Sequence, residues 1–253
     1  MSQRVLITAG GGGIGLAVAK AFVAQGARVH ISDINAEAVA AIVAENPAIT
    51  GSVGDVSKPE DVDALFAEVR EQLGGLDVLV NNAGIPGATA PVEEYPAETF
   101  AAVIGVNLQG TFNVTQRAIP LLKESEAASI ITMSSLAGRF GYPNRVAYST
   151  TKWGLVGFAK TLAMELGPFG ITSNTVHPGA VEGPRIMGVF EGRAKVSGRT
   201  VQEEIDRAME NQSVKKFIAP EDIAALILFL AGPHARTISG QMFPIDGDSK
   251  AAQ

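Results

Sequence analysis

Short apolar runs alternate with longer amphipathic runs along most of the chain. The short runs are rich in Val, Ile and Leu and predict strands at 4–8, 28–33, 76–82, 129–133, 171–176 and 241–246, with a weaker candidate at 48–55. The longer runs have apolar positions at helical spacing and predict helices at 14–25, 36–45, 59–73, 99–123, 147–166 and 220–230. This alternation predicts one α/β domain over residues 1–253, a doubly wound parallel sheet of about seven strands with helices on both faces.

One segment, residues 182–218, interrupts the alternation. It is polar and contains four glycines, at positions 183, 188, 192 and 198. Ligands of open parallel sheets bind beyond the carboxyl ends of the strands, where this segment follows a strand. The segment is therefore a candidate substrate loop or lid, and the alternative is a surface excursion that contains a helix.

Composition and net charge argue against several classes of protein. The net charge of −6 argues against a general binder of nucleic acid or of anionic membranes. No apolar run approaches the ~18 residues of a membrane span, and a strand-like run begins too early to leave room for a signal peptide. The chain has no cysteine, and its three histidines lack metal-ligand spacing. We expect a soluble, cytoplasmic protein without a metal site.

The segment LITAGGGGIG at 6–15 has the features of a phosphate-binding loop. It follows a predicted strand and opens a predicted helix, so its backbone N–H groups can face a pyrophosphate. The next strand ends at Asp33, 18 residues after Gly15, where a carboxylate can accept hydrogen bonds from ribose hydroxyls. It would also repel a 2′-phosphate, and no Arg or Lys lies at 9–13 or 34–37, so NAD(H) is favoured over NADP(H). Asp33 could instead cap the following helix, but Asn35 is an equally good cap.

Tyr148 and Lys152 are four residues apart and share one face of a predicted helix. A phenol has a pKa of about 10 and is a poor base at neutral pH. An ammonium about 4 Å away, at an effective dielectric of about 20, favours phenolate by roughly 4 kcal/mol. Tyr148 could then act as a general base or acid near neutral pH. Ser135 follows the strand at 129–133, at the edge where a hydroxyl could hydrogen-bond a substrate oxygen.

Together these motifs resemble the short-chain dehydrogenase/reductase family over essentially the whole chain. The family's glycine loop is similar to TAGGGGIG, its strand-end motif to NNAG at 81–84, and its adenine-contacting pair to Asp55-Val56. Asn107, Ser135, Tyr148 and Lys152 fit its catalytic positions in order and spacing. The segment HPG at 177–179 resembles the turn beside the nicotinamide, and SGQMFPIDGD at 239–248 resembles the closing strand.

The resemblance implies a Rossmann-type fold and hydride transfer between NAD(H) and a secondary alcohol or ketone. Tyr148 is the implied acid/base, Ser135 holds the substrate oxygen, and Lys152 lowers the tyrosine pKa and binds the nicotinamide ribose. Asn107 would continue the proton path. The implied cofactor-binding residues are Gly12, Gly13, Ile14, Gly15, Asp33, Asp55, Val56, Asn81, Ala83, Gly84, Tyr148, Lys152 and Val181. The resemblance also implies a homo-oligomer, a tetramer or a dimer, with an interface formed by the helices around 99–123 and 147–166.

The chain departs from the family pattern at three positions. Ala9 replaces the first glycine of the loop, Gly183 stands where many members have a threonine that contacts the cofactor carboxamide, and Asp248 makes the ending DGD. An alanine forced to positive φ would cost on the order of 1 kcal/mol. We therefore expect a negative φ at Ala9, with the turn made by the neighbouring glycines.

Substrate specificity should come from the loop before Tyr148 and from the 182–218 segment. Their candidate substrate contacts are Phe140, Tyr142, Asn144, Arg145, Arg185, Met187 and Phe190. Four arginines in these segments, Arg139, Arg145, Arg185 and Arg193, suggest an anion-binding site, because guanidinium groups bind carboxylate or sulfonate bidentately. A solvated charged face beside Glu182 and Glu191 is the alternative, and the sequence alone favours it. Trp153 is expected in the core or in an interface.

Other functions share parts of this pattern. A 3-oxoacyl-carrier-protein reductase usually uses NADPH and a basic docking patch, which Asp33 and the net charge argue against. A non-catalytic nucleotide sensor or scaffold would not need all four of Asn107, Ser135, Tyr148 and Lys152. A nucleotide-sugar epimerase usually has a longer substrate domain than this chain has room for.

Overall fold

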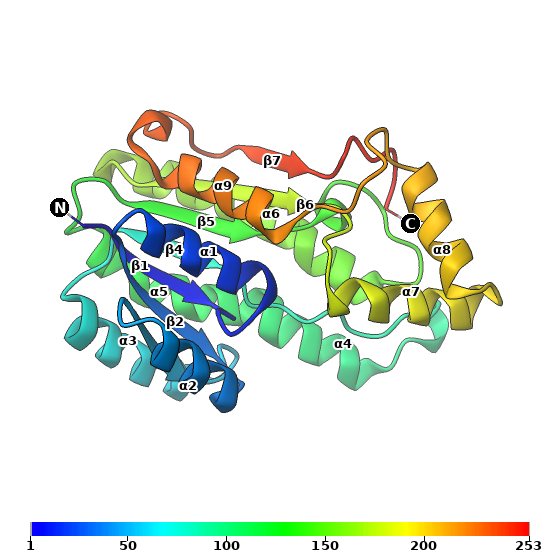
Figure 1. The fold of residues 1–253 in the computed structure, drawn as a ribbon, viewed down its shortest axis with the longest axis horizontal. Helices are drawn as coiled ribbons and strands as arrows, with labels where there is room; N and C mark the ends of the chain where they lie inside the picture. The colour runs from blue at the N-terminus through cyan, green and yellow to red at the C-terminus, as the bar shows by residue number, and fades with distance from the viewer. Residues whose placement is uncertain (1, 253) are drawn as a thin grey trace.

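Seven parallel strands form a single sheet in the order β3-β2-β1-β4-β5-β6-β7 (Figure 1). The protein is seen here in a computed structural model that describes residues 2–252; Met1 and Gln253, the ends of the predicted domain, lie outside the described residues. The strands are β1 (Arg4–Thr8), β2 (Arg28–Asp33), β3 (Ile49–Val53), β4 (Val78–Asn81), β5 (Ser129–Met133), β6 (Thr172–Pro178) and β7 (Met242–Ile245). The predicted fold class, a doubly wound α/β domain, is confirmed.

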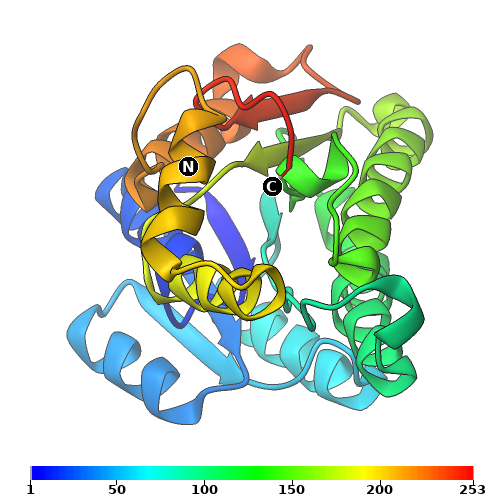
Figure 2. The same cartoon turned by 90° about the vertical axis from the view of Figure 1, so that its right-hand side faces the viewer.

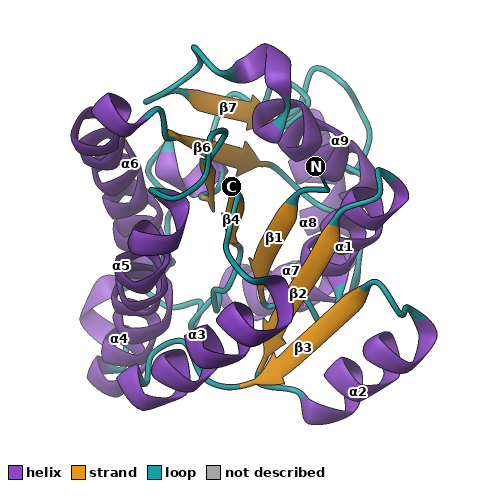
Figure 3. Cartoon of the chain, turned by 90° about the vertical axis from the view of Figure 1, so that its left-hand side faces the viewer, coloured by secondary structure: helices purple, strands orange, loops and turns teal. Residues whose placement is uncertain are grey.

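Two helical layers cover the sheet (Figure 3). One contains α1 (Gly13–Ala24), α2 (Ala36–Glu45) and α9 (Pro220–Ala231). The other contains α3 (Pro59–Leu73), α4 (Ala97–Ile104), α5 (Thr111–Leu122) and α6 (Val146–Leu166). Successive strand residues point to opposite faces, so Val5 and Ile7 join the core under α1 and α9, while Leu6 joins the core under α3 and α5. Because both faces are buried, β1, β4 and β5 are apolar at most positions, whereas the buried positions of β6 are mostly polar.

The predicted helix at 99–123 is helical from Ala97 to Leu122 but is not uniform. A π-helical segment, Gly105–Gly110, separates α4 from α5. Asn107 lies in this segment and is fully buried. Such segments are rare and occur frequently at functional sites.

The 182–218 segment folds mainly as two helices, α7 (Pro184–Ser197) and α8 (Val201–Glu210). Both lie beyond the carboxyl ends of the strands, across the end of the sheet (Figures 1 and 2). Residues after β7 return to α8: Gln212 forms an antiparallel bridge with Ser249, and the Asn211 side chain donates to the Ala251 carbonyl at 2.6 Å. No helix in the described part of the chain is both long and apolar enough to cross a membrane.

Candidate active site

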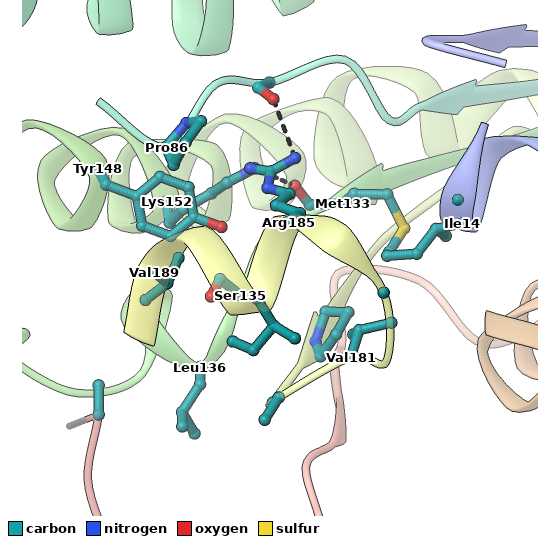
Figure 4. Close-up of a pocket in the computed structure, with 18 of the residues that line it drawn as sticks. Ile14, Pro86, Met133, Ser135, Leu136, Tyr148, Lys152, Val181, Arg185 and Val189 are labelled. Atoms are coloured by element: carbon teal, nitrogen blue, oxygen red, sulfur yellow. Dashed lines mark hydrogen bonds between the residues drawn. The ribbon is translucent and has the colours of Figure 1, made fainter. Parts of the chain in front are cut away.

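A cavity of about 520 Å³ follows the carboxyl edge of the sheet. It extends from Gly12 and Asp33, at the ends of β1 and β2, to Arg193 and Ala208 on α7 and α8. Residues that follow β5 and residues of α6 also line it, among them Ser135, Tyr148 and Lys152 (Figure 4). The fold therefore joins the glycine loop to the predicted catalytic residues in one space.

The glycine loop is packed closely against its neighbours. A Cβ on Gly10 would lie 2.6 Å from the Ile31 side chain, and one on Gly15 would lie 2.2 Å from the Ala9 carbonyl oxygen. Asn82 also holds that carbonyl, since its Nδ2 donates to Ala9 O at 3.1 Å and to Thr8 O at 3.1 Å. The path of the loop is thus fixed by close contacts at both ends.

The expectation of a negative φ at Ala9 is wrong. Ala9 has φ of 51°, in the left-handed region. The physical reason is the direction of its carbonyl, which points between Gly15 and the Asn82 amide. The neighbouring Gly10 cannot make this turn in place of Ala9, because Gly10 packs against the Ile31 side chain. The turn is shared between Ala9 and Gly13, whose φ is 50°.

Asp33 ends β2 beneath the glycine loop. One carboxylate oxygen accepts from the Gly11 N–H at 2.9 Å and the other from the Asn35 N–H at 3.0 Å. The cap of α2 is Asn35, whose side chain accepts from Ala38 N at 3.1 Å. Asp33 is therefore free of a capping role, and it lines the cavity.

The backbone around the cavity suits a dinucleotide. A Cβ on Gly12 or Gly13 would meet no atom within 4 Å, so the loop that opens α1 faces open space, where a pyrophosphate fits. At the other end, Ile218 accepts from Glu182 N at 3.0 Å and donates to Ala180 O at 2.9 Å. Val181 lies between those two bonds and turns its own N–H the opposite way. Val181 lines the cavity, in a position from which its N–H can bind a carboxamide.

The predicted cofactor residues fall into two groups. Those that line the cavity are Gly12, Gly13, Ile14, Asp33, Gly84, Tyr148, Lys152 and Val181. The others are not among the residues that line it: Gly15, Asp55, Val56, Asn81 and Ala83.

Two of the residues that do not line the cavity are hydrogen-bonded to their own neighbours. Asp55 accepts from the Ser57 N–H at 2.9 Å and from its hydroxyl at 2.7 Å. Asn81 is buried and donates to Thr115 Oγ1 at 2.9 Å. The Asp55 and Asn81 side chains therefore stabilise the segments beside the cavity.

Lys152 lies beneath Tyr148 on α6. Its ammonium nitrogen is 5.6 Å from the centre of the Tyr148 ring and donates to the Met133 carbonyl, at the end of β5, at 2.7 Å (Figure 4). Gly84 packs against this nitrogen, because a Cβ there would lie 3.5 Å from Lys152 Nζ and 3.2 Å from Asn107 Oδ1. A glycine at this position lets the loop after β4 approach the lysine closely.

The electrostatics favour the phenolate. Burial alone raises the pKa of Tyr148, but Lys152 and then Arg185 more than offset it, and the Ser135 hydroxyl and Arg145 act in the same direction. The pKa of Tyr148 is lowered to about 8. Burial also lowers the pKa of Lys152, against the attraction of Tyr148. The tyrosine can therefore lose and regain a proton near physiological pH.

Ser135 follows β5, and a buried histidine fixes its backbone. His177 Nδ1 lies 3.0 Å from the Ser135 carbonyl, which can only accept, so this nitrogen carries the proton. His177 Nε2 lies 2.8 Å from the Thr175 hydroxyl. The Ser135 Oγ accepts from the Ala137 N–H at 3.2 Å, which leaves its own proton available for a phenolate or a substrate oxygen.

Asn107 holds the loop that follows β4. Its Oδ1 accepts from the Ile85 N–H at 2.8 Å, and its Nδ2 donates to the Ile85 carbonyl at 3.1 Å and to Thr151 Oγ1 at 3.0 Å. Asn107 lies outside the cavity lining, with its side chain beside Gly84.

The specificity candidates also divide into two groups. Tyr142, Arg145, Arg185 and Phe190 line the cavity. Phe140, Asn144 and Met187 do not, and Met187 is partly exposed. Trp153 lies outside the cavity and is 47% exposed, so it is not a core residue.

The sequence did not point to several of the residues that form the site. Asn82, the second asparagine of NNAG, lines the cavity and braces Ala9, whereas Asn81 was singled out. Its position one residue beyond β4 is the signal that could have identified it. The tail residues Ala251 and Ala252 also line the cavity, and nothing in their composition indicates this.

Two departures from the family pattern have structural causes. Gly183 has φ of 136°, a conformation that a threonine would adopt only with strain. Asp248 has φ of 56°, which an aspartate tolerates, and it accepts from the Ser213 hydroxyl at 2.7 Å. Glycine at position 183 and aspartate at position 248 are therefore both compatible with the positive φ found there.

Comparisons with known proteins agree with this geometry. A family model described as "Enoyl-(Acyl carrier protein) reductase" matches residues 9–247. The D-beta-hydroxybutyrate dehydrogenase of Cupriavidus necator is 34% identical over 250 residues, covering 97% of this chain and 96% of that protein. Two crystal structures superpose over 97% of this chain.

One of these structures is NAD+-bound xylitol dehydrogenase, with a TM-score of 0.93, 29% identity and 98% of that chain covered. The other is a variant of the actinorhodin polyketide ketoreductase with NADPH, with a TM-score of 0.92, 32% identity and 96% of that chain covered. The match of sequence, fold and site extends over almost the whole length, and this chain belongs to the short-chain dehydrogenase/reductase family, whose members act as oxidoreductases on hydroxyl and keto groups.

Proposed function

We propose that this enzyme transfers a hydride between NAD(H) and a secondary alcohol or ketone, with Tyr148 as the general acid/base. The observation that carries the proposal is the lowered pKa of Tyr148 in a cavity that also contains Ser135, Lys152 and a glycine loop. A phenol with a pKa of about 8 is matched to proton exchange with a carbinol oxygen near neutral pH.

Each side chain has a separate proposed task. In oxidation the hydroxyl proton of the alcohol passes to the Tyr148 phenolate, and in reduction the phenol returns it to the ketone oxygen. Ser135 donates to the same oxygen and stabilises its developing charge. Lys152 keeps the phenolate stable and binds the nicotinamide ribose, and Asn107, beside Gly84, is the proposed next member of the proton path. When bound, NAD supplies the hydride acceptor for oxidation and the donor for reduction.

We propose NAD rather than NADP because Asp33 lines the adenosine end of the cavity. Its carboxylate is held toward the loop by Gly11 and Asn35, where it would meet the ribose hydroxyls. Binding of the cofactor would use all thirteen predicted residues, the eight cavity-lining residues above together with Gly15, Asp55, Val56, Asn81 and Ala83. The test compares kcat/KM for NAD with kcat/KM for NADP, each measured at the same fixed concentration of the alcohol or ketone. A preference for NADP would remove the basis for this choice and favour the 3-oxoacyl-carrier-protein reductase alternative.

The decisive experiment for the reaction is Tyr148→Phe. We expect the phenylalanine variant to lose turnover by at least ~100-fold, the lower end of what general acid–base catalysis contributes. Cofactor binding, followed by NADH fluorescence, should persist because the ribose contacts of Lys152 remain. Turnover that survives the substitution would show that Tyr148 is not the acid/base. A wild-type protein that binds cofactor but turns over no alcohol or ketone would favour the sensor or scaffold alternative.

The remaining parts of the proposal concern assembly and location. We propose that α7 and α8 act as a substrate lid. We also propose that the protein is cytoplasmic and that it is a homo-oligomer, a dimer or tetramer. Exposed apolar side chains on and after the proposed interface helices support the assembly: Phe112, Trp153, Met164 and Phe169. Sedimentation that gives a particle of 26.3 kDa would contradict it.

A further inference from the structure

The four arginines near the substrate end of the cavity have different partners. Arg139 pairs with Asp246 at 2.5 Å, so its charge is compensated. Arg185 reaches across the cavity from α7 and donates to the Gly84 carbonyl at 3.0 Å (Figure 4). Among residues 2–252, no carboxylate forms an ion pair with Arg145 or Arg193, both of which line the cavity. The solvated charged face that the sequence favoured does not describe Arg145, which is 2% exposed.

Arg145 is a buried cation whose hydrogen bonds are incomplete. Its Nη2 donates to the Pro86 carbonyl at 3.0 Å, and its Nη1 lies 3.4 Å from Thr89 Oγ1. Its Nε is buried and has no hydrogen-bond partner. Burying a guanidinium without a counter-charge is costly, so such a group indicates an anion that arrives with a ligand.

The surroundings of Arg145 add positive potential. Arg145 is the N-cap residue of α6, a helix of 21 residues whose first turn contains no acidic residue. The positive end of the helix dipole therefore lies at the same place as the guanidinium. Arg193 approaches from α7, and the two guanidinium carbons lie 5.4 Å and 5.2 Å from the centre of the same Tyr142 ring. Arg193 contributes to the lowered pKa of Glu204, but the Glu204 carboxylate is bonded to Ser197 and Arg199.

We propose that Arg145 and Arg193, which both lie against Tyr142, bind an anionic group of the substrate. The inference rests on the proposed function and names its substrate class: short hydroxy acids and the corresponding keto acids, as carboxylates or sulfonates. The Arg145 guanidinium carbon lies 5.4 Å from the centre of the Tyr148 ring. An alcohol bonded to Tyr148 therefore has its anionic group only a few bonds from the carbinol carbon. Arginine suits this task because its planar fork binds either oxyanion with two hydrogen bonds.

The test compares an acid with its neutral counterpart. The substrates are 3-hydroxybutyrate, its methyl ester and 2-hydroxypropane-1-sulfonate, each assayed with NAD in the wild type and in Arg145→Met and Arg193→Met. We expect the wild type to prefer the anions, and each variant to lower the acid-to-ester ratio of kcat/KM by about 10- to 100-fold. Arg207→Met is the matched control: Arg207 is exposed on α8, outside the cavity lining, and its loss should leave the ratio unchanged.

The outcomes separate the two proposals. A wild type that turns over the ester as well as the acids, with a ratio that the variants do not change, overturns the anion site and leaves the dehydrogenase function intact. A wild type that turns over none of the three substrates contradicts the short hydroxy-acid substrate class, while the proposed function still depends on the turnover of other secondary alcohols and ketones. The anion site is then judged by binding alone: malonate should raise the melting temperature of the wild type and of Arg207→Met, but not that of Arg193→Met. If malonate stabilises none of them, or all of them equally, the inference is wrong. Arg193 is half-exposed on the lid, so Arg193→Met serves if Arg145→Met fails to fold.

Discussion

A tyrosine needs nearby cations to act as a base near neutral pH, and three of them surround Tyr148. Lys152 is the neighbour on the same helix, while Arg185 and Arg145 approach from α7 and from the start of α6. The Lys152 contribution follows from the spacing of two residues in the sequence. The arginine contributions depend on loops that fold back over the cavity, which no local pattern predicts.

This arrangement predicts the pH dependence of catalysis. For alcohol oxidation, kcat/KM should rise with pH and level off above about 8, because only the Tyr148 phenolate accepts the proton. In Arg185→Met, Tyr148 loses a neighbouring cation, so its pKa rises. The rising limb, which is the increase of kcat/KM with pH, then moves to higher pH. Arg185→Lys keeps the charge and should keep the limb in place. A limb that stays fixed in Arg185→Met would show that Arg185 does not act on the tyrosine.

The left-handed Ala9 predicts a change in stability. Glycine adopts a positive φ without the contact between Cβ and the carbonyl oxygen, so Ala9→Gly should raise the free energy of unfolding by about 1 kcal/mol. Ala17→Gly, in the interior of α1, is the control and should lower that free energy by about 1 kcal/mol. Urea unfolding of both variants measures the two effects. If Ala9→Gly is as destabilising as the control, the strain at Ala9 is not real.

At the scale of elements, the helices with strong end signals were the most predictable. The boundaries of α3 match the prediction because Pro59 occupies its first turn and Gly74, with φ of 71°, ends it. The strand boundaries agree to within two residues, since apolar runs buried on both faces begin and end abruptly. The π-helical segment was not predictable, because it depends on bonds from Asn107 to Ile85 and Thr151, which are distant in sequence.

The two glycines that bound this π-helical segment provide a matched pair of substitutions. A Cβ on Gly110 would lie 2.6 Å from Val56 Cγ2, whereas one on Gly105 would meet no atom within 4 Å. Gly110→Ala should therefore lower the free energy of unfolding by about 1–3 kcal/mol through overpacking. Gly105 is helical, with φ of −56°, so Gly105→Ala should raise that free energy by up to about 1 kcal/mol. Thermal unfolding of the two variants is the measurement, and equal shifts would contradict the close packing on Val56.

At the scale of the whole molecule, the cavity is completed by segments from both ends of the sequence. The glycine loop lies at one end, and α7 and α8 lie at the other together with the tail. The hydrogen bonds from Lys250 N to Asn211 O and from Asn211 Nδ2 to Ala251 O join the tail to α8. The sequence predicted a segment at this end of the cavity, because residues 182–218 interrupt the alternation of strands and helices. It could not predict the tail contact, because the pairing of two short polar segments carries no periodic signal.

The same packing buries two histidines in the sheet, and this gives the whole molecule a pH-dependent stability. His30, on β2, lies between the hydroxyls of Thr50 and Ser52, each at 2.7 Å. His177, on β6, bonds to the backbone of Ser135. Burial lowers the pKa of each of these histidines to about 4, from 6.5 in the unfolded chain. Between these two pH values the unfolded chain binds more protons than the folded one, so the stability is fully present above about 6.5 and falls as the pH falls toward 4.

For each histidine the lost stability between pH 7 and pH 5 should be about 2 kcal/mol. The measurement is urea unfolding at both pH values of the wild type, His30→Gln and His234→Gln. Carboxylates contribute to the slope in all three proteins alike, so the difference between variants isolates the histidine. His30→Gln should lose about 2 kcal/mol less than the wild type between the two pH values, even if it is less stable at pH 7. His234 is exposed, and its replacement should leave the wild-type slope unchanged. An unchanged slope in His30→Gln would mean that His30 keeps the pKa of the unfolded chain when folded, and at pH 5 the hydroxyls of Thr50 and Ser52 would then have to accept from both ring nitrogens.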